Sequence, residues 1–187
     1  MNFKISKTKI KDVLLGEIIS KNDERGYFER VYCFDEFKNL LNIKKNLIQI
    51  NRSMSKIQGT IRGFHFQWPP YQESRIVSCP KGKIFDVAVD LRKGSQTYLD
   101  YVSYELSETN KKFLLIPEGF GHGFQTLEPY SETLYLVTGK YSFEHEDGIS
   151  PFEPKVKINW PLECEVLSEK DKNRKYLKDR DFSGILL

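Results

Sequence analysis

The sequence predicts an all-β fold, a single antiparallel jelly roll with short helices at its ends, from three observations. Aromatic residues make up 13% of the chain, with 13 Phe and 10 Tyr, which favours sheets over a helical bundle. Short apolar runs recur along most of the chain, and clusters of turn-forming residues separate them. Helical periodicity is confined to two short stretches. A sandwich of short strands accounts for all three observations.

Apolar or aromatic runs mark the expected strands, and turn signals at residues 80–82, 93–95, 117–121 and 128–131 separate several of them. Within residues 83–90, Phe85, Val87 and Val89 alternate with Asp86 and Asp90, so we expect one face to be core and the other to be wet or functional. The expected strands are Leu47–Ile50, Ile76–Cys79, Ile84–Leu91, Tyr98–Leu106, Phe113–Ile116 and Thr133–Thr138.

Helical signals are few. Phe34, Phe37, Leu40 and Leu41 recur at helical spacing and predict one short helix, and the charged stretch after Ser168 predicts another. The chain shows no internal repeat, low-complexity tract or linker. We therefore expect one domain over residues 1–187, a jelly roll with an N-terminal strand extension and a C-terminal helical tail.

Composition argues against several classes of function. The 29 Lys+Arg against 26 Asp+Glu leave a net charge of +3, too small and too dispersed for a nucleic-acid-binding surface. Charges recur through the first eleven residues, and no apolar run approaches the roughly 18 residues of a spanning helix. Neither secretion nor membrane insertion is expected. Cys33, Cys79 and Cys164 form no CxxC pair and no even set, which favours a structural role in a reducing cytoplasm.

Histidine is scarce, since only three occur, and His65 and His122 lie in glycine-containing, aromatic-flanked segments. A histidine on a strand is more often a hydrogen-bonded structural residue than a catalyst, so its surrounding sequence must be used to choose between the two roles. A regular pleat would place Arg62 and Phe64 on the face opposite His65, although Gly63 offers a break in that regularity.

Several segments in a fixed order resemble the dTDP-4-dehydrorhamnose 3,5-epimerase family: DERGYFE (23–29), RGFHFQWPP (62–70), GKIFDVAVDLRKGSQTY (82–98), IPEGFGHGFQTLE (116–128), INWPL (158–162) and LSEKD (167–171). The resemblance covers nearly the whole chain from Asp23 onward. It implies a cupin-type jelly-roll β-sandwich with short flanking helices, and a homodimer with strands exchanged between subunits. The implied substrate is a nucleotide-diphospho-4-keto-6-deoxy sugar, whose product serves dTDP-rhamnose and cell-surface polysaccharide biosynthesis.

Such a substrate sets three chemical tasks. A ketone at C4 acidifies the hydrogens on C3 and C5, so inversion needs a base on one face, an acid on the other and stabilisation of the enolate oxygen. By the resemblance, His65 is the base, Asp171 orients it, and Tyr135 returns a proton from the opposite face. A carboxylate on one imidazole nitrogen fixes the tautomer and stabilises the protonated ring.

One position departs from the family. The family usually carries a lysine ten residues after the strand histidine, and this chain has Arg75 there. Both side chains are cationic, but the guanidinium is a planar, bulkier fork of donors. Arg75 is expected to bind the enolate oxygen, and its shape is expected to affect how the sugar sits and which centres are inverted.

The resemblance also assigns substrate binding. His122 and Tyr141 would line the sugar pocket. Arginine forks suit a diphosphate, while amides and a carboxylate can read base and sugar edges. The nucleotide half is therefore expected at Arg25, Glu29, Gln49, Asn51 and Arg62, with thymidine as the family's default base.

No metal or other cofactor is expected. Many cupins bind a metal through a closely spaced H-x-H pair, a carboxylate and a later histidine. The corresponding triplet here is His65-Phe66-Gln67, which lacks one ligand of the pair, and His122 has no local His or Cys partner.

Three alternatives remain open at the level of sequence. A C3-only epimerase, or an isomerase that moves the ketone between C3 and C4, would share much of the same pocket. A non-catalytic sugar-binding cupin would have no required role for Tyr135 or Asp171. Solvent deuterium exchange into a 4-keto sugar nucleotide separates them: a binding module gives no exchange, a C3 epimerase exchange at one carbon, and a 3,5-epimerase exchange at both.

Overall fold

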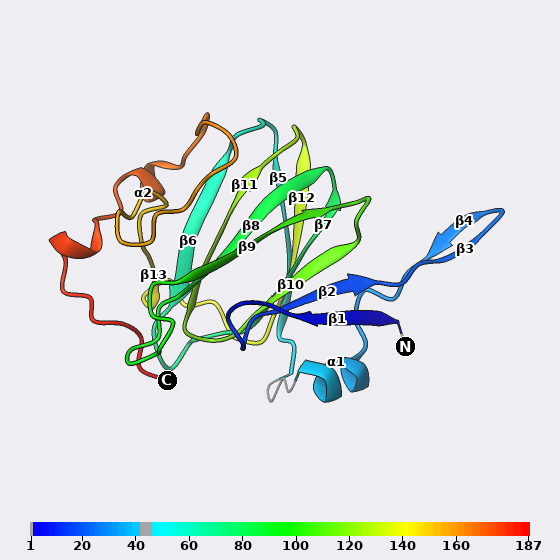
Figure 1. Cartoon of the computed structure of the whole chain (residues 1–187), viewed down its shortest axis with the longest axis horizontal. Helices are drawn as coiled ribbons and strands as arrows, with labels where there is room; N and C mark the ends of the chain where they lie inside the picture. The colour runs from blue at the N-terminus through cyan, green and yellow to red at the C-terminus, as the bar shows by residue number, and fades with distance from the viewer. Residues whose placement is uncertain (1, 42–45) are drawn as a thin grey trace.

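Two antiparallel sheets form a sandwich in the computed structural model, which describes residues 2–41 and 46–187 (Figure 1). In spatial order, one sheet contains β1 (Phe3–Lys7), β2 (Leu14–Ile18), β10 (Lys112–Ile116), β7 (Arg75–Lys81), β12 (Ser131–Val137) and β5 (Gln49–Ser55). The other contains β13 (Glu146–Gly148), β6 (Ile61–Gln67), β11 (Phe120–Thr126), β8 (Lys83–Asp90) and β9 (Tyr101–Ser107). This confirms the predicted all-β sandwich.

The main core lies between the two sheets. Val77 on β7 and Leu114 on β10 are fully buried, as are Ile84 and Ala88 on β8, and these side chains belong to one cluster. Burying a side chain the size of Val77, Ile84 or Leu114 stabilises the fold by about 1.5–3 kcal/mol relative to leaving it exposed. The central strands of both sheets are therefore the best-anchored part of the fold, and they carry most of the site described below.

Strand β8 corrects one expectation. Val87 and Val89 do pack in a core cluster, but on the outer side of their sheet, where the segment after residue 148 covers them with residues such as Ile149. The opposite face is also buried: Asp86 and Asp90 have no exposed surface. The alternation predicted two different faces correctly, and of the two alternatives for the polar face, wet or functional, the wet one is wrong. The polar face lies toward the sandwich interior, where the neighbouring apolar positions of the same face join the main core.

Each of the six expected strands is present, four with bounds within two residues and two with larger differences, and the expected list omits other strands, β11 among them. Residues 47–50 overlap only the start of β5, and residues 98–100 form a turn before β9. Strand β5 is an edge strand with a mostly exposed polar sequence, so its extent carries no clear alternation. Strand β11 was read partly as a turn because of its glycines. Gly121 and Gly123 instead allow close packing, since a Cβ at Gly123 would lie 2.9 Å from the carbonyl oxygen of Arg62.

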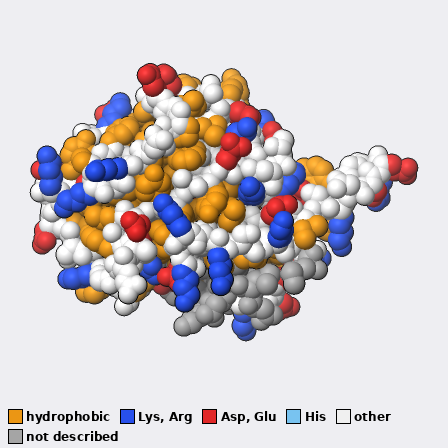
Figure 2. Space-filling model, viewed as in Figure 1, with side chains coloured by type: hydrophobic (Ala, Val, Ile, Leu, Met, Phe, Trp, Pro, Cys, Tyr) orange, Lys and Arg blue, Asp and Glu red, His pale blue; other side chains and the backbone are white. Residues whose placement is uncertain are grey.

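The expected helices are present as α1 (Phe34–Leu41) and α2 (Glu169–Lys172), with a short 3-10 helix at Leu177–Asp179. Phe37 of α1 packs on the outer face of the six-stranded sheet, with its ring centroid 4.7 Å from that of Phe3. Strands β3 (Lys21–Asp23) and β4 (Gly26–Phe28) form a hairpin that projects from the body as an arm (Figures 1 and 2). No helix within the described ranges is long and apolar enough to cross a membrane.

Candidate active site

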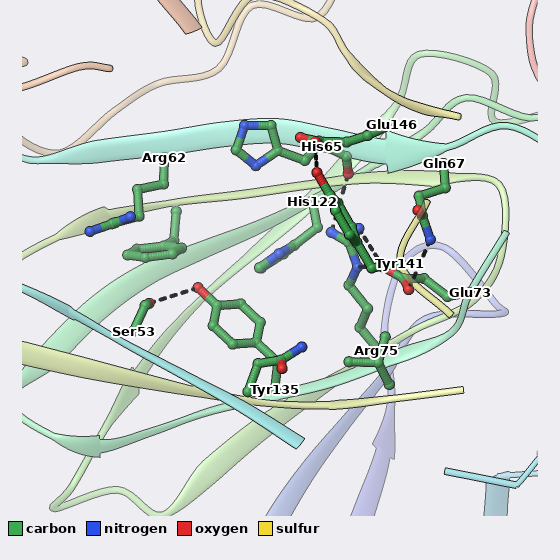
Figure 3. A pocket seen from close by; sticks show the side chains of 13 residues that line it. Ser53, Arg62, His65, Gln67, Glu73, Arg75, His122, Tyr135, Tyr141 and Glu146 are labelled. Atoms are coloured by element: carbon green, nitrogen blue, oxygen red, sulfur yellow. Dashed lines mark hydrogen bonds and ion pairs between the residues drawn. The ribbon is translucent and has the colours of Figure 1, made fainter. Parts of the chain in front are cut away.

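A cavity of about 250 Å³ opens between the two sheets (Figure 3). Side chains from both sheets line it, so a molecule bound there would have one sheet on either side. The lining residues are Asn51, Ser53, Arg62, His65, Gln67, Glu73, Arg75, His122, Phe124, Tyr135, Val137, Tyr141 and Glu146.

Arg62 and His65 both line this cavity, although they are three residues apart on β6. A regular pleat would put them on opposite faces, but the pleat is broken where Gly63 allows it, and the pairing of β6 with β11 shifts register between His122 and Phe124. Gly63, at φ +129°, lies at this irregularity, and a Cβ there would be 2.5 Å from the Cα of Gly123. Only glycine fits this close approach, and the break turns two polar side chains toward one site.

His65 is paired with Asp171. Its Nε2 lies 2.7 Å from Oδ1 of Asp171, which is 3% exposed and belongs to α2. Ser168 caps this helix by accepting a hydrogen bond from the Asp171 N–H. Burial alone would raise the pKa of Asp171, but the hydrogen bonds from His65 and its other neighbours outweigh burial and lower it. An ionised carboxylate only accepts, so Nε2 carries the proton and Nδ1 is the nitrogen able to take one.

A second histidine–aspartate pair lies beside the first. His122 on β11 is directly opposite His65 in the strand register, and its Nε2 is 2.7 Å from Oδ1 of Asp86 on β8. Both side chains are almost wholly buried. This pair fixes the His122 ring in the part of the cavity wall that the five-stranded sheet forms.

Tyr135 enters the cavity from β12, on the facing sheet. Its hydroxyl is 3.1 Å from the Ser53 hydroxyl of β5, and its ring lies edge-on to that of His122, with centroids 5.9 Å apart. Burial is the main cause of a raised pKa for the Tyr135 phenol. The phenol therefore keeps its proton at neutral pH, as a proton donor must.

Arg75 reaches the cavity from β7 and is held by two neighbours. Its Nε donates to Oε1 of Glu73 at 2.8 Å, and Nη2 lies 2.7 Å from the same oxygen. Nη1 donates to the carbonyl oxygen of His65 at 3.2 Å. These contacts bring the arginine at the family's lysine position next to the predicted base.

Tyr141 and Glu146 close one side of the cavity. The Tyr141 hydroxyl donates to Oε2 of Glu146 at 2.7 Å, and this oxygen also pairs with Nζ of Lys170 at 2.7 Å. The hydrogen bond to Glu146 is the main cause of a raised pKa for Tyr141. Burial would raise the pKa of Glu146, but Lys170 and Tyr141 hold it below its ordinary value.

The residues expected to bind the nucleotide fall into two groups. Asn51 and Arg62 line the cavity, and Gln49 borders it through its Oε1, which accepts a hydrogen bond from the Tyr141 N–H at 3.2 Å. Arg25 and Glu29 are not among the residues that line it. Arg25 lies at the tip of the projecting hairpin with 84% of its side chain exposed, and Glu29 pairs with Lys111 at 3.1 Å.

Sequence reasoning missed several residues of the site. Two of them had a usable signal, because Gln67 lies two residues after His65 and Glu73 two residues before Arg75, the spacing of one strand face. Asp86 was noticed only as part of a polar strand face. Glu146, Lys170 and Ser53 had no local signal, since nothing in their own segments distinguishes them from exposed polar residues.

The described residues contain no group of three or more His, Cys, Asp or Glu side chains arranged to hold a metal ion. The absence of a metal stays a prediction, based on the missing ligand in His65-Phe66-Gln67.

Comparisons with known proteins agree with the resemblance noted in the sequence. The family model described as dTDP-4-dehydrorhamnose 3,5-epimerase matches residues 7–179. A dTDP-4-dehydrorhamnose 3,5-epimerase of Sinorhizobium fredii is 46% identical over 154 residues, covering 81% of this chain and 78% of the relative. The dTDP-4-dehydrorhamnose 3,5-epimerase of Shigella flexneri is 39% identical over 178 residues, covering 95% of this chain and 98% of the relative.

A solved structure extends the match to three dimensions. The dTDP-6-deoxy-D-glucose-3,5-epimerase of Legionella pneumophila, crystallised with dTDP-4-keto-L-rhamnose, superimposes with a TM-score of 0.91 at 36% identity. The match covers 96% of this chain and 95% of that one. Sequence and fold agree, and the chain belongs to the dTDP-4-dehydrorhamnose 3,5-epimerase family.

Proposed function

We propose that this protein is an epimerase that inverts C3 and C5 of a nucleotide-diphospho-4-keto-6-deoxy sugar, converting dTDP-4-dehydro-6-deoxyglucose to dTDP-4-dehydrorhamnose. One observation carries the proposal. His65, paired with Asp171, comes from one sheet, and Tyr135 comes from the facing sheet, so base and acid lie on opposite sides of one cavity. Inversion at a carbon requires this arrangement.

The reaction follows from these positions. His65 removes the proton from the carbon beside the C4 ketone, and the electron pair of that C–H bond moves to form an enolate. Asp171 stabilises the imidazolium through the contact at 2.7 Å, and Arg75 offers N–H donors to the enolate oxygen. Tyr135 then delivers a proton to the opposite face of the same carbon. His65 and Tyr135 return to their starting states by exchange with solvent.

The nucleotide site extends the proposal to a homodimer with strand exchange. Arg25 and Glu29 lie on or beside the β3–β4 hairpin, an arm that projects from the body of its own subunit (Figure 1), and neither residue lines the cavity. The arm exposes 63% of Tyr27 and 62% of Phe28, and edge strand β5 exposes Ile50. Exposed apolar surface on an arm and an edge strand suits burial against a second copy of the chain. The arm of each subunit would then supply Arg25 and Glu29 to the partner's cavity.

Deuterium wash-in tests the reaction. The protein is incubated in D₂O with dTDP-4-dehydro-6-deoxyglucose, and proton NMR follows the signals at C3 and C5 together with formation of the rhamno product. A 3,5-epimerase exchanges both positions and forms the product. Exchange at C3 alone would mean a C3 epimerase, and no exchange would mean a binding protein.

Complementation tests the shared site. Arg25→Ala and His65→Asn subunits are each expected to be weakly active, and they are mixed after separate purification, unfolding and joint refolding. If Arg25 serves the partner's cavity, the mixed dimer contains one cavity with both groups intact. Activity should then return to about a quarter of wild type for random pairing. No recovery, or a monomeric mass by light scattering, would contradict the strand-exchanged dimer.

We place the reaction in the cytoplasm, as a step in rhamnose-type cell-surface polysaccharide biosynthesis. The proposal is supported by the three cysteines, which are all free, including the half-buried Cys33 and the exposed Cys164. Free thiols are the usual state in a reducing compartment.

A further inference from the structure

The arginine at the family's lysine position is bound to a carboxylate that the reaction as proposed does not use. Glu73 lies in the segment before β7, lines the cavity, and keeps 11% of its side chain exposed. Its Oε1 accepts from Nε of Arg75 at 2.8 Å, and its Oε2 accepts from Nε2 of Gln67 at 3.2 Å (Figure 3). Each carboxylate oxygen therefore has a different partner.

These contacts join the two sheets at the site. Gln67 and His65 belong to β6 of one sheet, and Arg75 belongs to β7 of the other. Gln67 is itself fixed, because its Nε2 donates to the carbonyl oxygen of Tyr71 at 2.9 Å and to that of Lys140 at 3.0 Å. The amide nitrogen has two hydrogens, so the longer contact to Glu73 at 3.2 Å shares one of them. Glu73 is thus held by an immobile partner on the strand of the base, and it holds Arg75 in turn.

The orientation of the guanidinium follows from this. Nε donates a hydrogen bond to Glu73, Nη2 lies 2.7 Å from the same carboxylate oxygen, and one N–H of Nη1 donates to the carbonyl of His65. The remaining N–H groups on Nη1 and Nη2 stay available to a bound molecule. A lysine ammonium is a compact charge that needs no such alignment, whereas a planar fork binds well only when its plane is fixed.

We propose that Glu73 is the positioning residue for Arg75: it fixes the plane of the guanidinium so that the arginine can bind the sugar's C4 oxygen in place of a lysine. The inference rests on the proposed epimerase function, because the oxygen to be bound is that of the 4-keto sugar. Glu73 acts through Arg75 and does not touch the reacting atoms.

A double-mutant cycle in Glu73→Gln and Arg75→Lys tests the inference. Turnover, the Michaelis constant and deuterium wash-in are measured for wild type, both single variants and the double variant. Loss of an oriented oxyanion donor costs about 10²–10³-fold in turnover, and loss of its orientation alone is expected to cost on the order of tenfold. Glu73→Gln should therefore lower turnover about tenfold in the arginine background, with little change in the Michaelis constant. In the Arg75→Lys background it should cost less than about threefold.

Glu132→Gln is the matched control. Glu132 pairs with Arg52 at 3.4 Å on the six-stranded sheet, and neither residue lines the cavity. The turnover of the Glu132→Gln variant should equal that of wild type. Thermal unfolding checks each variant, and Glu73→Asp replaces Glu73→Gln in the cycle if the latter does not fold, because it keeps the charge but shortens the reach to Arg75.

The outcomes separate the two proposals. If wild type is active and the substitution at Glu73 costs the same in both backgrounds, Glu73 has a structural role independent of Arg75 and the inference is overturned. Unchanged turnover in the arginine background would also overturn it. A wild-type protein that neither exchanges nor epimerises the sugar would overturn the proposed function and this inference with it.

Discussion

Asp171→Asn isolates the electrostatic part of the His65 pair, because asparagine keeps the size of the side chain and removes its charge. Two unit charges 2.7 Å apart at an effective dielectric constant of about 20 attract by about 6 kcal/mol. The His65 side chain is 31% exposed, so solvent screens part of this. We expect about 2–4 kcal/mol of the imidazolium's stabilisation to be lost, which corresponds to a fall in turnover of roughly 30- to 1,000-fold.

The assay measures turnover and the Michaelis constant separately on the dTDP-linked 4-keto sugar, together with deuterium wash-in. The Michaelis constant should change little, because Asp171 does not line the cavity. Asp179→Asn, which alters an exposed carboxylate of the same tail, should behave as wild type. A turnover within about threefold of wild type, from a folded Asp171→Asn protein, would refute the reasoning that Asp171 acts through His65.

Further predictions concern the catalytic base, the proton donor and the stability of the fold at low pH. His65→Asn should abolish wash-in at both carbons while the melting temperature stays near that of wild type, and wash-in near the wild-type rate would exclude His65 as the base. Tyr135→Phe should lower net inversion more than wash-in, and Tyr141→Phe should mainly raise the Michaelis constant; the reverse pattern would exchange their roles. The lowered pKa of Asp171 stabilises the fold above the unfolded pKa of about 3.9, and this stability is lost as pH falls through the folded pKa. The stability gap between wild type and Asp171→Asn, measured by urea unfolding, should therefore narrow in acid.

Local patterns predicted those parts of the fold in which one chain segment shows its own periodicity. The spacing of Phe34 and Phe37 is enough for α1, and the alternation along residues 83–90 is enough for β8. Strand β11 escaped because its glycines resemble a turn, and only the neighbouring strand explains them, since Gly123 packs directly against Arg62.

The site depends on contacts that no local pattern contains. Asp171 contacts His65 although 106 positions separate them in the chain, and in the sequence only the family resemblance predicts that they interact. The sequence shows that Gly63 can break the pleat, but the break that turns Arg62 and His65 toward one cavity also requires the register shift of the opposite strand. The sequence shows that Arg75 departs from the family, but only the side-chain geometry identifies Glu73 as its partner.

The C-terminal tail gives the site a weak point that the sheets do not share. His65, Arg75, His122 and Tyr135 lie on paired strands, whereas Asp171 lies on a four-residue helix in the long segment after β13. Ion pairs from Arg174 and Arg180 to Asp147 and the burial of Leu177 hold this segment to the body. Backbone hydrogen bonds from Ile61 to Val166 and from Ile185 to Leu91 tie both ends of the stretch that carries Asp171 to the five-stranded sheet and the loop beside it. The stretch between these ties, with its local backbone hydrogen bonds at α2, is the part that can open below the global unfolding temperature. Heating should therefore separate Asp171 from His65 and inactivate the enzyme before the sheets melt. Because the sandwich keeps its shape at that temperature, cooling should restore the pair and the activity.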